Sequence, residues 1–186
     1  MYDHGFHIGS NVISLLVIYP VYQYRVMPTP NNKIIAKLYV SILIPWEKHI
    51  KYLEPKGKFD IRSKEFLKFK RAASLAIRSV DNSTDAHETI LAHLTSQLPP
   101  QNIVIVLKGD SSIARCIFRH LRNSIAHGNI ETIKIKNNNY VKFIDINPRN
   151  ENNNFIMILR TRNLEHFISA LMTTIKESPL AFIDVT

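Results

Sequence analysis

The chain has 186 residues, of which 45% are hydrophobic and 21% are charged, the composition of an ordinary soluble globular protein. Its single cysteine, Cys116, excludes an internal disulfide bond and suits a reducing compartment. The formal net charge of +9 favours a polyanionic partner, with nucleic acid first and an anionic membrane surface second. A surplus of basic residues that only keeps the protein in solution is the alternative.

Two apolar runs, at residues 12–22 and 38–46, are the candidates for a membrane segment or a leader. Both are much shorter than the roughly 20 residues that a helix needs to cross a bilayer. No lysine or arginine precedes the first run, so it also lacks the basic start of a secretory signal. We therefore interpret both runs as core segments and expect a cytoplasmic protein without membrane contact.

The first part of the chain is predicted to lead into a helix. Residues 1–30 are a poorly defined segment that ends in Met27-Pro28-Thr29-Pro30, where the prolines force an extended backbone. The two asparagines that follow can cap a helix over about 33–53. Pro45 would kink that helix or divide it.

Helical periodicity returns at 60–80, where apolar side chains form a stripe on one face. A shorter amphipathic helix is predicted to follow and to end near Leu98, because Pro99-Pro100 cannot continue it. The apolar run at 103–107 is either a buried strand or the lead-in to the next helix, since periodicity does not distinguish the two.

A helix over 111–127 has the clearest boundaries in the chain. Asp110-Ser111-Ser112 is a strong N-cap signal, and Gly128 is a C-terminal stop. Apolar residues recur at every fourth position and predict a buried seam formed by Ile113, Ile117, Leu121 and Ile125.

The pattern then changes to alternation, which predicts a small antiparallel β-meander over 131–160. A final helix should begin at Thr161 or Asn163. We therefore expect a mainly α fold, a helical bundle with the meander inserted before the last helix, in a single domain over 1–186.

The end of the 111–127 helix carries the residues that indicate chemistry, Arg122, Asn123 and His127. An arginine binds phosphate in a bidentate manner and keeps its charge at ordinary pH. A histidine can take the proton of a ribose 2′-hydroxyl or give one to the leaving 5′-oxygen. Asn123 can orient either group. These three are the candidate catalytic residues for cutting RNA without a metal ion.

Three more residues of this helix, Arg115, Arg119 and His120, are candidates for binding an RNA backbone. The arginines continue to Arg122 at helical spacing and so form a basic stripe beside the histidines. An ordinary solvated face, whose charges gain only from the helix dipole, is the alternative. Because Arg122 and His127 diverge by about 140° around one helix, two facing copies of the helix would best complete the site.

The Arg-x4-His spacing by itself has little value. About 0.4 such spacings are expected by chance from the arginine and histidine content, and the chain has two. The other one, Arg115 and His120, lies in the middle of the helix. Only the pair Arg122 and His127 has an asparagine after the arginine and a glycine after the histidine.

The run Arg122-Asn123-Ser124-Ile125-Ala126-His127-Gly128 resembles the Arg-x4-6-His motif of HEPN domains, in the common form Arg-Asn-x-x-Ala-His. The meander and last helix are similar to one branch of that family, over about residues 60–178. The resemblance implies an α-helical bundle that dimerises through the motif helices and acts as a metal-independent endoribonuclease. It assigns catalytic roles to Arg122 and His127 and a supporting polar role to Asn123.

The same resemblance bears on partners. It implies a toxin, phage-defence or mobile-element protein that cuts RNA as a homodimer, and it leaves a cognate antitoxin open as a partner. Some members have a tyrosine two residues after the histidine, which a partner nucleotidyltransferase modifies, whereas this chain has Asn129 there. Other HEPN domains are inactive and bind a nucleotide, RNA or a partner protein.

Three other patterns indicate no further chemistry. His87 and His93 are six residues apart rather than the four of a zinc-binding helix. The run Lys108-Gly109-Asp110-Ser111-Ser112 is too short for a phosphate-binding P-loop. Cys116 is predicted to be a small core residue rather than a nucleophile. We therefore expect neither a metal ion nor a cofactor.

Overall fold

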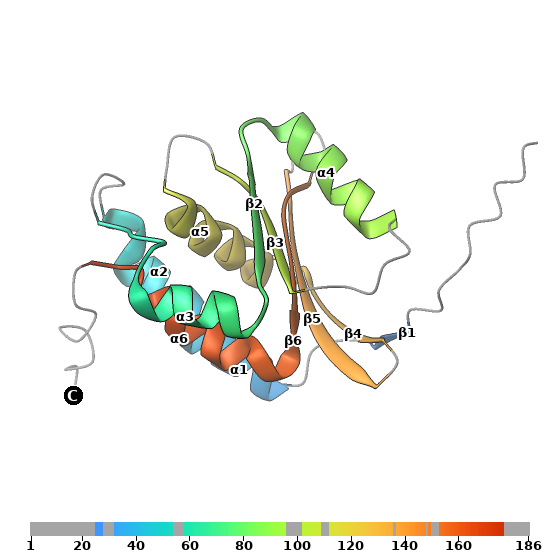
Figure 1. The fold of residues 1–186 in the computed structure, drawn as a ribbon, viewed down its shortest axis with the longest axis horizontal. Helices are drawn as coiled ribbons and strands as arrows, with labels where there is room; N and C mark the ends of the chain where they lie inside the picture. The colour runs from blue at the N-terminus through green and yellow to red at the C-terminus, as the bar shows by residue number, and fades with distance from the viewer. Residues whose placement is uncertain are drawn as a thin grey trace, which may run out of the picture.

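The computed structural model is centred on a six-stranded mixed β-sheet with the strand order β1-β4-β5-β6-β3-β2 (Figure 1). It describes residues 25–27, 32–53, 58–95, 102–108, 112–135, 137–147, 149 and 153–176. The strands are β1 (Arg25–Met27), β2 (Ala76–Val80), β3 (Ile103–Leu107), β4 (Ile130–Ile135), β5 (Asn138–Ile146) and β6 (Asn153–Arg160). Strands β2 and β3 are parallel, and the other neighbouring pairs are antiparallel.

Helices lie on both faces of this sheet. The α-helices are α1 (Asn32–Leu38), α2 (Ile44–Lys48), α3 (Lys64–Ala72), α4 (Ser83–Thr95), α5 (Ile113–Ala126) and α6 (Leu164–Met172). Shorter segments are the π-helical η1 (Tyr39–Leu43) and the 3₁₀ helices η2 (Ile50–Tyr52) and η3 (Thr161–Asn163). None of the helices in the described ranges is both long and apolar enough to cross a membrane.

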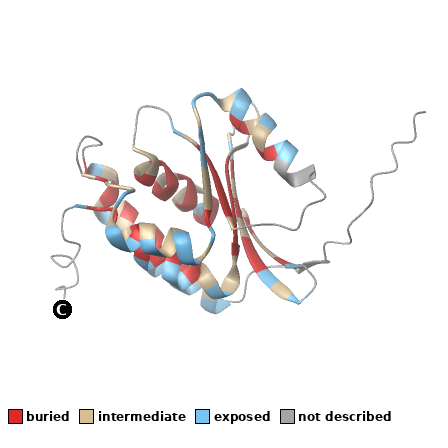
Figure 2. Ribbon diagram, in the orientation of Figure 1, coloured by how far each residue is buried: buried red, intermediate tan, exposed pale blue. Residues whose placement is uncertain are grey.

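Two separate cores form because successive strand residues point to opposite faces of the sheet. On one face, Val104, Phe143 and Phe155 pack with buried residues of α1, α3, α5 and α6. On the other face, Ile105 and Ile156 pack against Ile90 of α4 (Figures 1 and 2). The candidate site described below belongs to the face that α5 covers.

The prediction of a mainly α bundle is wrong. The meander is confirmed as the antiparallel strands β4, β5 and β6, but it is not an appendage. Its strand β6 pairs with β3, which pairs with β2, so the meander forms the middle of the sheet. Strand β3 is the apolar run at 103–107 that periodicity left open. Its first four residues are buried, as expected for a strand covered on both faces.

The predicted helix over 60–80 is also wrong in its second half. Helix α3 ends at Ala72, and the chain turns at Ser74, which has a φ of +48°. The Leu75 N–H donates to Lys70 O (2.9 Å) and the Ser74 N–H donates to Arg71 O (3.1 Å), the bonds of a Schellman motif. Glycine or asparagine usually occupies this position, so the serine gave no signal that the helix stops. Residues 76–80 form strand β2 instead of the predicted second half of the helix.

The other predicted helices are confirmed. The segment 33–53 is helical and is divided just before Pro45, where the π-helical η1 gives way to α2. Helix α4 and the last helix α6 lie in the predicted segments, and the predicted end of α4 near Leu98 lies outside the described residues. Of the N-terminal 30 residues, the structure describes 25–27, which form β1. The apolar run at 12–22 lies outside the described residues.

Both ends of α5 are fixed by the predicted signals. The Ser112 Oγ accepts a hydrogen bond from the Arg115 N–H (3.3 Å) as the N-cap. At the other end, Gly128 has a φ of +70°, and the Asn129 N–H donates to Ser124 O (2.8 Å) in a second Schellman motif. The chain then enters β4 directly, so the end of the helix is held against the sheet.

Candidate functional site

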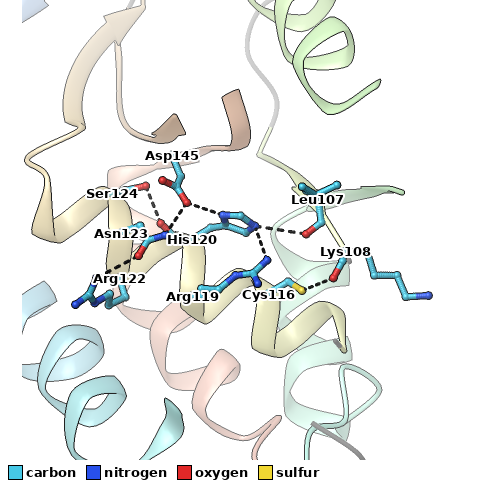
Figure 3. A network of polar contacts seen from close by, with 9 residues as sticks. All are labelled: Leu107, Lys108, Cys116, Arg119, His120, Arg122, Asn123, Ser124 and Asp145. Carbon is cyan, nitrogen blue, oxygen red and sulfur yellow. Dashed lines mark hydrogen bonds and ion pairs between the residues drawn. The ribbon is translucent and has the colours of Figure 1, made fainter. Parts of the chain in front are cut away.

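The candidate site is formed by the C-terminal half of α5, by α2 beside it and by β5 beneath it. Helix α5 contributes Arg122, Asn123 and His127. Asn123 is hydrogen-bonded both to Arg122 and to Asp145, which comes from β5 (Figure 3). The arrangement therefore brings together residues that are far apart in the sequence.

Arg122 is held by a carboxylate of α2. Its Nε–H donates to Glu47 Oε1 (2.6 Å), and its Nη2 lies 2.5 Å from the same oxygen. The other oxygen, Oε2, accepts from Lys51 Nζ at 2.7 Å. Each of these side chains is about one-third exposed, which places the cluster at the surface. Two cations thus share one anion, and the cluster keeps an excess positive charge.

The two cations also determine the protonation of Glu47. Hydrogen bonds from Lys51 and then from Arg122 lower the pKa of the Glu47 carboxyl from its ordinary value of 4.5. Because the pKa is lowered on folding, the stabilisation from this pair is present above pH 4.5. It is lost only as the pH falls through the lowered value. Glu47 is therefore ionised at neutral pH.

Asn123 links Arg122 to the interior. Its Oδ1 accepts a hydrogen bond from Arg122 Nη1 (3.3 Å), while its Nδ2 donates to Asp145 Oδ2 (2.9 Å). A guanidinium has five N–H donors, and Glu47 and Asn123 use three of them. Within the described ranges the remaining two have no partner.

His127 is the C-cap of α5 and is exposed to solvent. Its backbone N–H donates to Asn123 O (3.0 Å), which extends the helix to this residue. The imidazole has no polar partner within the part of the chain that the structure describes. Its side chain is therefore open to a substrate or to a second protein chain.

The residues predicted to bind RNA separate into two groups. Arg115 lies over the Trp46 ring at 5.7 Å and donates from Nη2 to Lys51 O (3.2 Å), on the same side as Arg122. His120 is buried, and Arg119 lies against it, with Nη2 3.4 Å from the His120 Nε2. The interior position of His120 gives it no access to an RNA backbone.

Sequence reasoning missed Glu47, Lys51 and Asp145. Glu47 and Lys51 are an i, i+4 pair, a pattern that indicates only helix stability. Glu47 is 75 residues from Arg122 and Asp145 is 22 residues from Asn123, so only the tertiary fold brings them together. The local signal was an aspartate two residues after Phe143 in an alternating strand, at a position where the alternation predicts an apolar side chain.

The structure also bears on the other candidates. Cys116 is buried, its S–H donates to Lys108 O (2.7 Å), and burial raises the pKa of the thiol. Its prediction as a core residue is confirmed. In the described part of the chain, no group of three or more His, Cys, Asp or Glu side chains is placed to hold a metal ion.

Comparison with known protein families gives a match over most of the chain. A protein-family model described as HEPN pEK499 p136 matches residues 18–180. No curated protein and no solved structure matches the chain significantly. The family model extends over most of the chain and includes both α2 and the motif helix α5. The chain therefore belongs to the HEPN pEK499 p136 family of HEPN domains.

Proposed function

We propose that this protein is a metal-independent endoribonuclease of the HEPN type. The observation that carries the proposal is the anchored Arg122 guanidinium, two of whose N–H donors have no partner among the described residues, on the helix that ends in the exposed His127. The net charge of +9 supports an RNA partner, since phosphate neutralisation supplies much of the affinity for nucleic acid.

The reaction is an internal transfer at one phosphate of RNA. The ribose 2′-oxygen attacks the adjacent phosphorus, an O2′–P bond forms, and the P–O5′ bond breaks. The products are a 2′,3′-cyclic phosphate and a 5′-hydroxyl. His127 acts as general base or general acid. Arg122 stabilises the negative charge that develops on the phosphorane oxygens, and Asn123 orients Arg122.

Two histidines are needed if one takes the proton from O2′ while another gives a proton to O5′. A homodimer that places two copies of α5 together would supply both. We place the dimer surface on η1 and α2, next to α5, because both carry exposed apolar side chains. These are Tyr39, Val40 and Ile44, which precede Glu47 in the same helical segment. Val40 is 65% exposed, although Leu38 and Ile42 in the same helical segment are buried, so it is a large apolar side chain left open to solvent.

The dimer surface predicts a specific disruption. The double variant Val40→Glu with Ile44→Glu should be monomeric and should lose most RNA cleavage, because charges would face each other across the apolar patch. Light scattering after gel filtration measures the mass, and circular dichroism checks that the fold is retained. Leu91→Glu, at an exposed apolar position on the opposite face, is the matched control. A wild-type monomer that cuts RNA would refute the composite site.

The experiment that tests the function is cleavage of a labelled RNA by purified protein in excess EDTA. The expected result is cutting at unchanged rate, with products that carry 2′,3′-cyclic phosphate ends. A requirement for added metal, or 3′-hydroxyl ends, would contradict the mechanism.

A second candidate is a HEPN module that binds a nucleotide, RNA or a partner protein without catalysis. The observation that favours it is that Arg122 is already paired with Glu47 in the single chain, as in a structural ion pair. RNA binding by fluorescence anisotropy without any cleavage would support this candidate over the nuclease. A toxin or phage-defence setting, with or without a cognate antitoxin, remains part of the nuclease proposal.

A further inference from the structure

The polar network of the site continues into the interior, to two buried residues that have no part in the proposed cleavage chemistry. Asp145 is 5% exposed and His120 is 3% exposed, although both are ionisable. Asp145 lies on β5 two residues after Phe143, at a position where an apolar side chain would otherwise fill the space under α5. Burying a carboxylate is costly unless hydrogen-bond donors surround it, so its partners indicate what it does.

Those partners both come from α5. The Asp145 Oδ2 lies 2.7 Å from His120 Nδ1 and accepts from Asn123 Nδ2 at 2.9 Å. His120 and Asn123 are three residues apart and therefore project from the same side of the helix (Figure 3). One carboxylate thus binds two side chains that lie about one turn apart on the motif helix.

The carboxylate dictates which way the Asn123 amide points. An ionised carboxylate only accepts hydrogen bonds, so it selects the NH₂ end of the amide. The carbonyl end is then directed to Arg122, where Oδ1 accepts from Nη1 at 3.3 Å. In the reversed orientation, the amide oxygen would face the carboxylate of Asp145 and the NH₂ group would face the guanidinium, which are both repulsive pairs.

His120 fixes the carboxylate in turn. Its ring stacks on Phe155 with centroids 5.4 Å apart and an interplanar angle of 9°. With Nδ1–H donated to Asp145, the Nε2 atom can accept from Arg119 Nη2 at 3.4 Å. The Leu107 carbonyl oxygen lies at the same distance from Nε2. Stacking on Phe155 and the contacts with Asp145 and Arg119 orient the ring, so the Asp145 carboxylate has a well-defined support.

We propose that Asp145 is a positioning residue of the site, which acts through Asn123 to orient the Arg122 guanidinium towards the phosphate. Arg122 is then held from two directions, by Glu47 at Nε and Nη2 and by Asn123 at Nη1. The inference rests on the proposed function for its effect on catalysis. The geometric part of the inference, that Asp145 orients Arg122 through Asn123, does not depend on the proposed function.

The kinetic test is a double-mutant cycle between Asp145→Asn and Asn123→Ala. Asp145→Asn should lower kcat about 10- to 100-fold and change KM less than about twofold, since misplacement of a catalytic group costs rate rather than binding. The same substitution should cause no further loss in the Asn123→Ala background. Glu131→Gln, which removes a carboxylate from neighbouring β4, is the control and should leave kcat unchanged. Losses that multiply in the double variant would overturn the proposal.

A second variant tests the same route and does not require that Asp145→Asn folds normally. Asn123→Asp places two carboxyl groups together, and one shared proton would restore the donor that the amide supplies. The ratio of its kcat to that of the wild type should therefore rise as the pH falls. A ratio that is flat with pH would contradict the proposed route.

A spectroscopic test separates this inference from the nuclease proposal. The ¹⁵N-detected Nε–H resonance of Arg122 should move in Asp145→Asn to the position it has in Asn123→Ala. If the wild type cuts no RNA but the two resonances coincide, the positioning role stands and the proposed function fails. If RNA is cut but the Arg122 resonance in Asp145→Asn stays at its wild-type position, the positioning role fails.

Discussion

The variant His127→Ala is expected to lose RNA cleavage by about 10²- to 10⁴-fold, the usual contribution of a positioned acid or base. His127 is the exposed C-cap of α5, and its side chain has no polar partner in the described ranges, so its removal should not unfold the protein. Cleavage of a labelled RNA in EDTA measures the loss, and the thermal midpoint shows that the fold is retained.

The control for this variant is His166→Ala, which removes another exposed histidine, on α6. It should cut at the wild-type rate. In cells, expression of the wild type should slow growth, and His127→Ala should relieve the effect. Normal cleavage by His127→Ala would remove the imidazole from the mechanism and contradict the proposed role of His127.

Arg122→Ala is the variant with the second large effect. It removes the guanidinium that stabilises the phosphorane, and we expect a loss of about 10²- to 10³-fold in kcat. Arg122→Lys should recover only part of this loss, because an ammonium group keeps the charge but cannot donate to Glu47, Asn123 and a phosphate in one plane. Single-turnover cleavage rates at saturating enzyme measure the chemical step.

The matched control is Arg162→Ala, which removes one exposed positive charge from η3 and should change the rate little. This comparison distinguishes a specific role from a general loss of basic charge, which weakens RNA binding uniformly. Equal effects of the two variants would show that Arg122 contributes only to the overall field of the protein.

Helix α5 could be predicted because its determinants are local. The cap at Ser112, the four-residue apolar repeat and the turn at Gly128 all lie within or next to the helix. The meander was predictable for the same reason, since alternation within each strand reports which face is buried. These two elements carry the motif and the strand under it, so much of the site could be located from the sequence.

The architecture of the sheet could not be predicted in the same way. Whether the apolar run in β3 is a strand depends on β2 and β6, which pair with it from different parts of the chain. The turn at Ser74 disguised β2, because a serine with positive φ carries no local signal. Without β2 and β3 the predicted sheet had too few strands, and the prediction of a helical bundle was therefore wrong.

The residues that contact the motif could not be predicted from the sequence either. Glu47 and Asp145 are ordinary acidic residues until the fold places them beside Arg122 and Asn123. Placing His120 among the RNA-binding residues followed from its position on the helix wheel. The wheel shows direction from the helix axis, and it does not show that β5 and β6 cover that side.

Strand β1 has a practical meaning for work with shortened forms of the protein. Its three residues pair with β4 from Arg25 opposite Lys134 to Met27 opposite Thr132, and so cover the outer edge of that strand. A form that starts after residue 27 would expose unpaired N–H and C=O groups along β4, a template on which another molecule can add a strand. Fragments made for crystallisation or spectroscopy should keep residues 25–27 to avoid edge-to-edge aggregation.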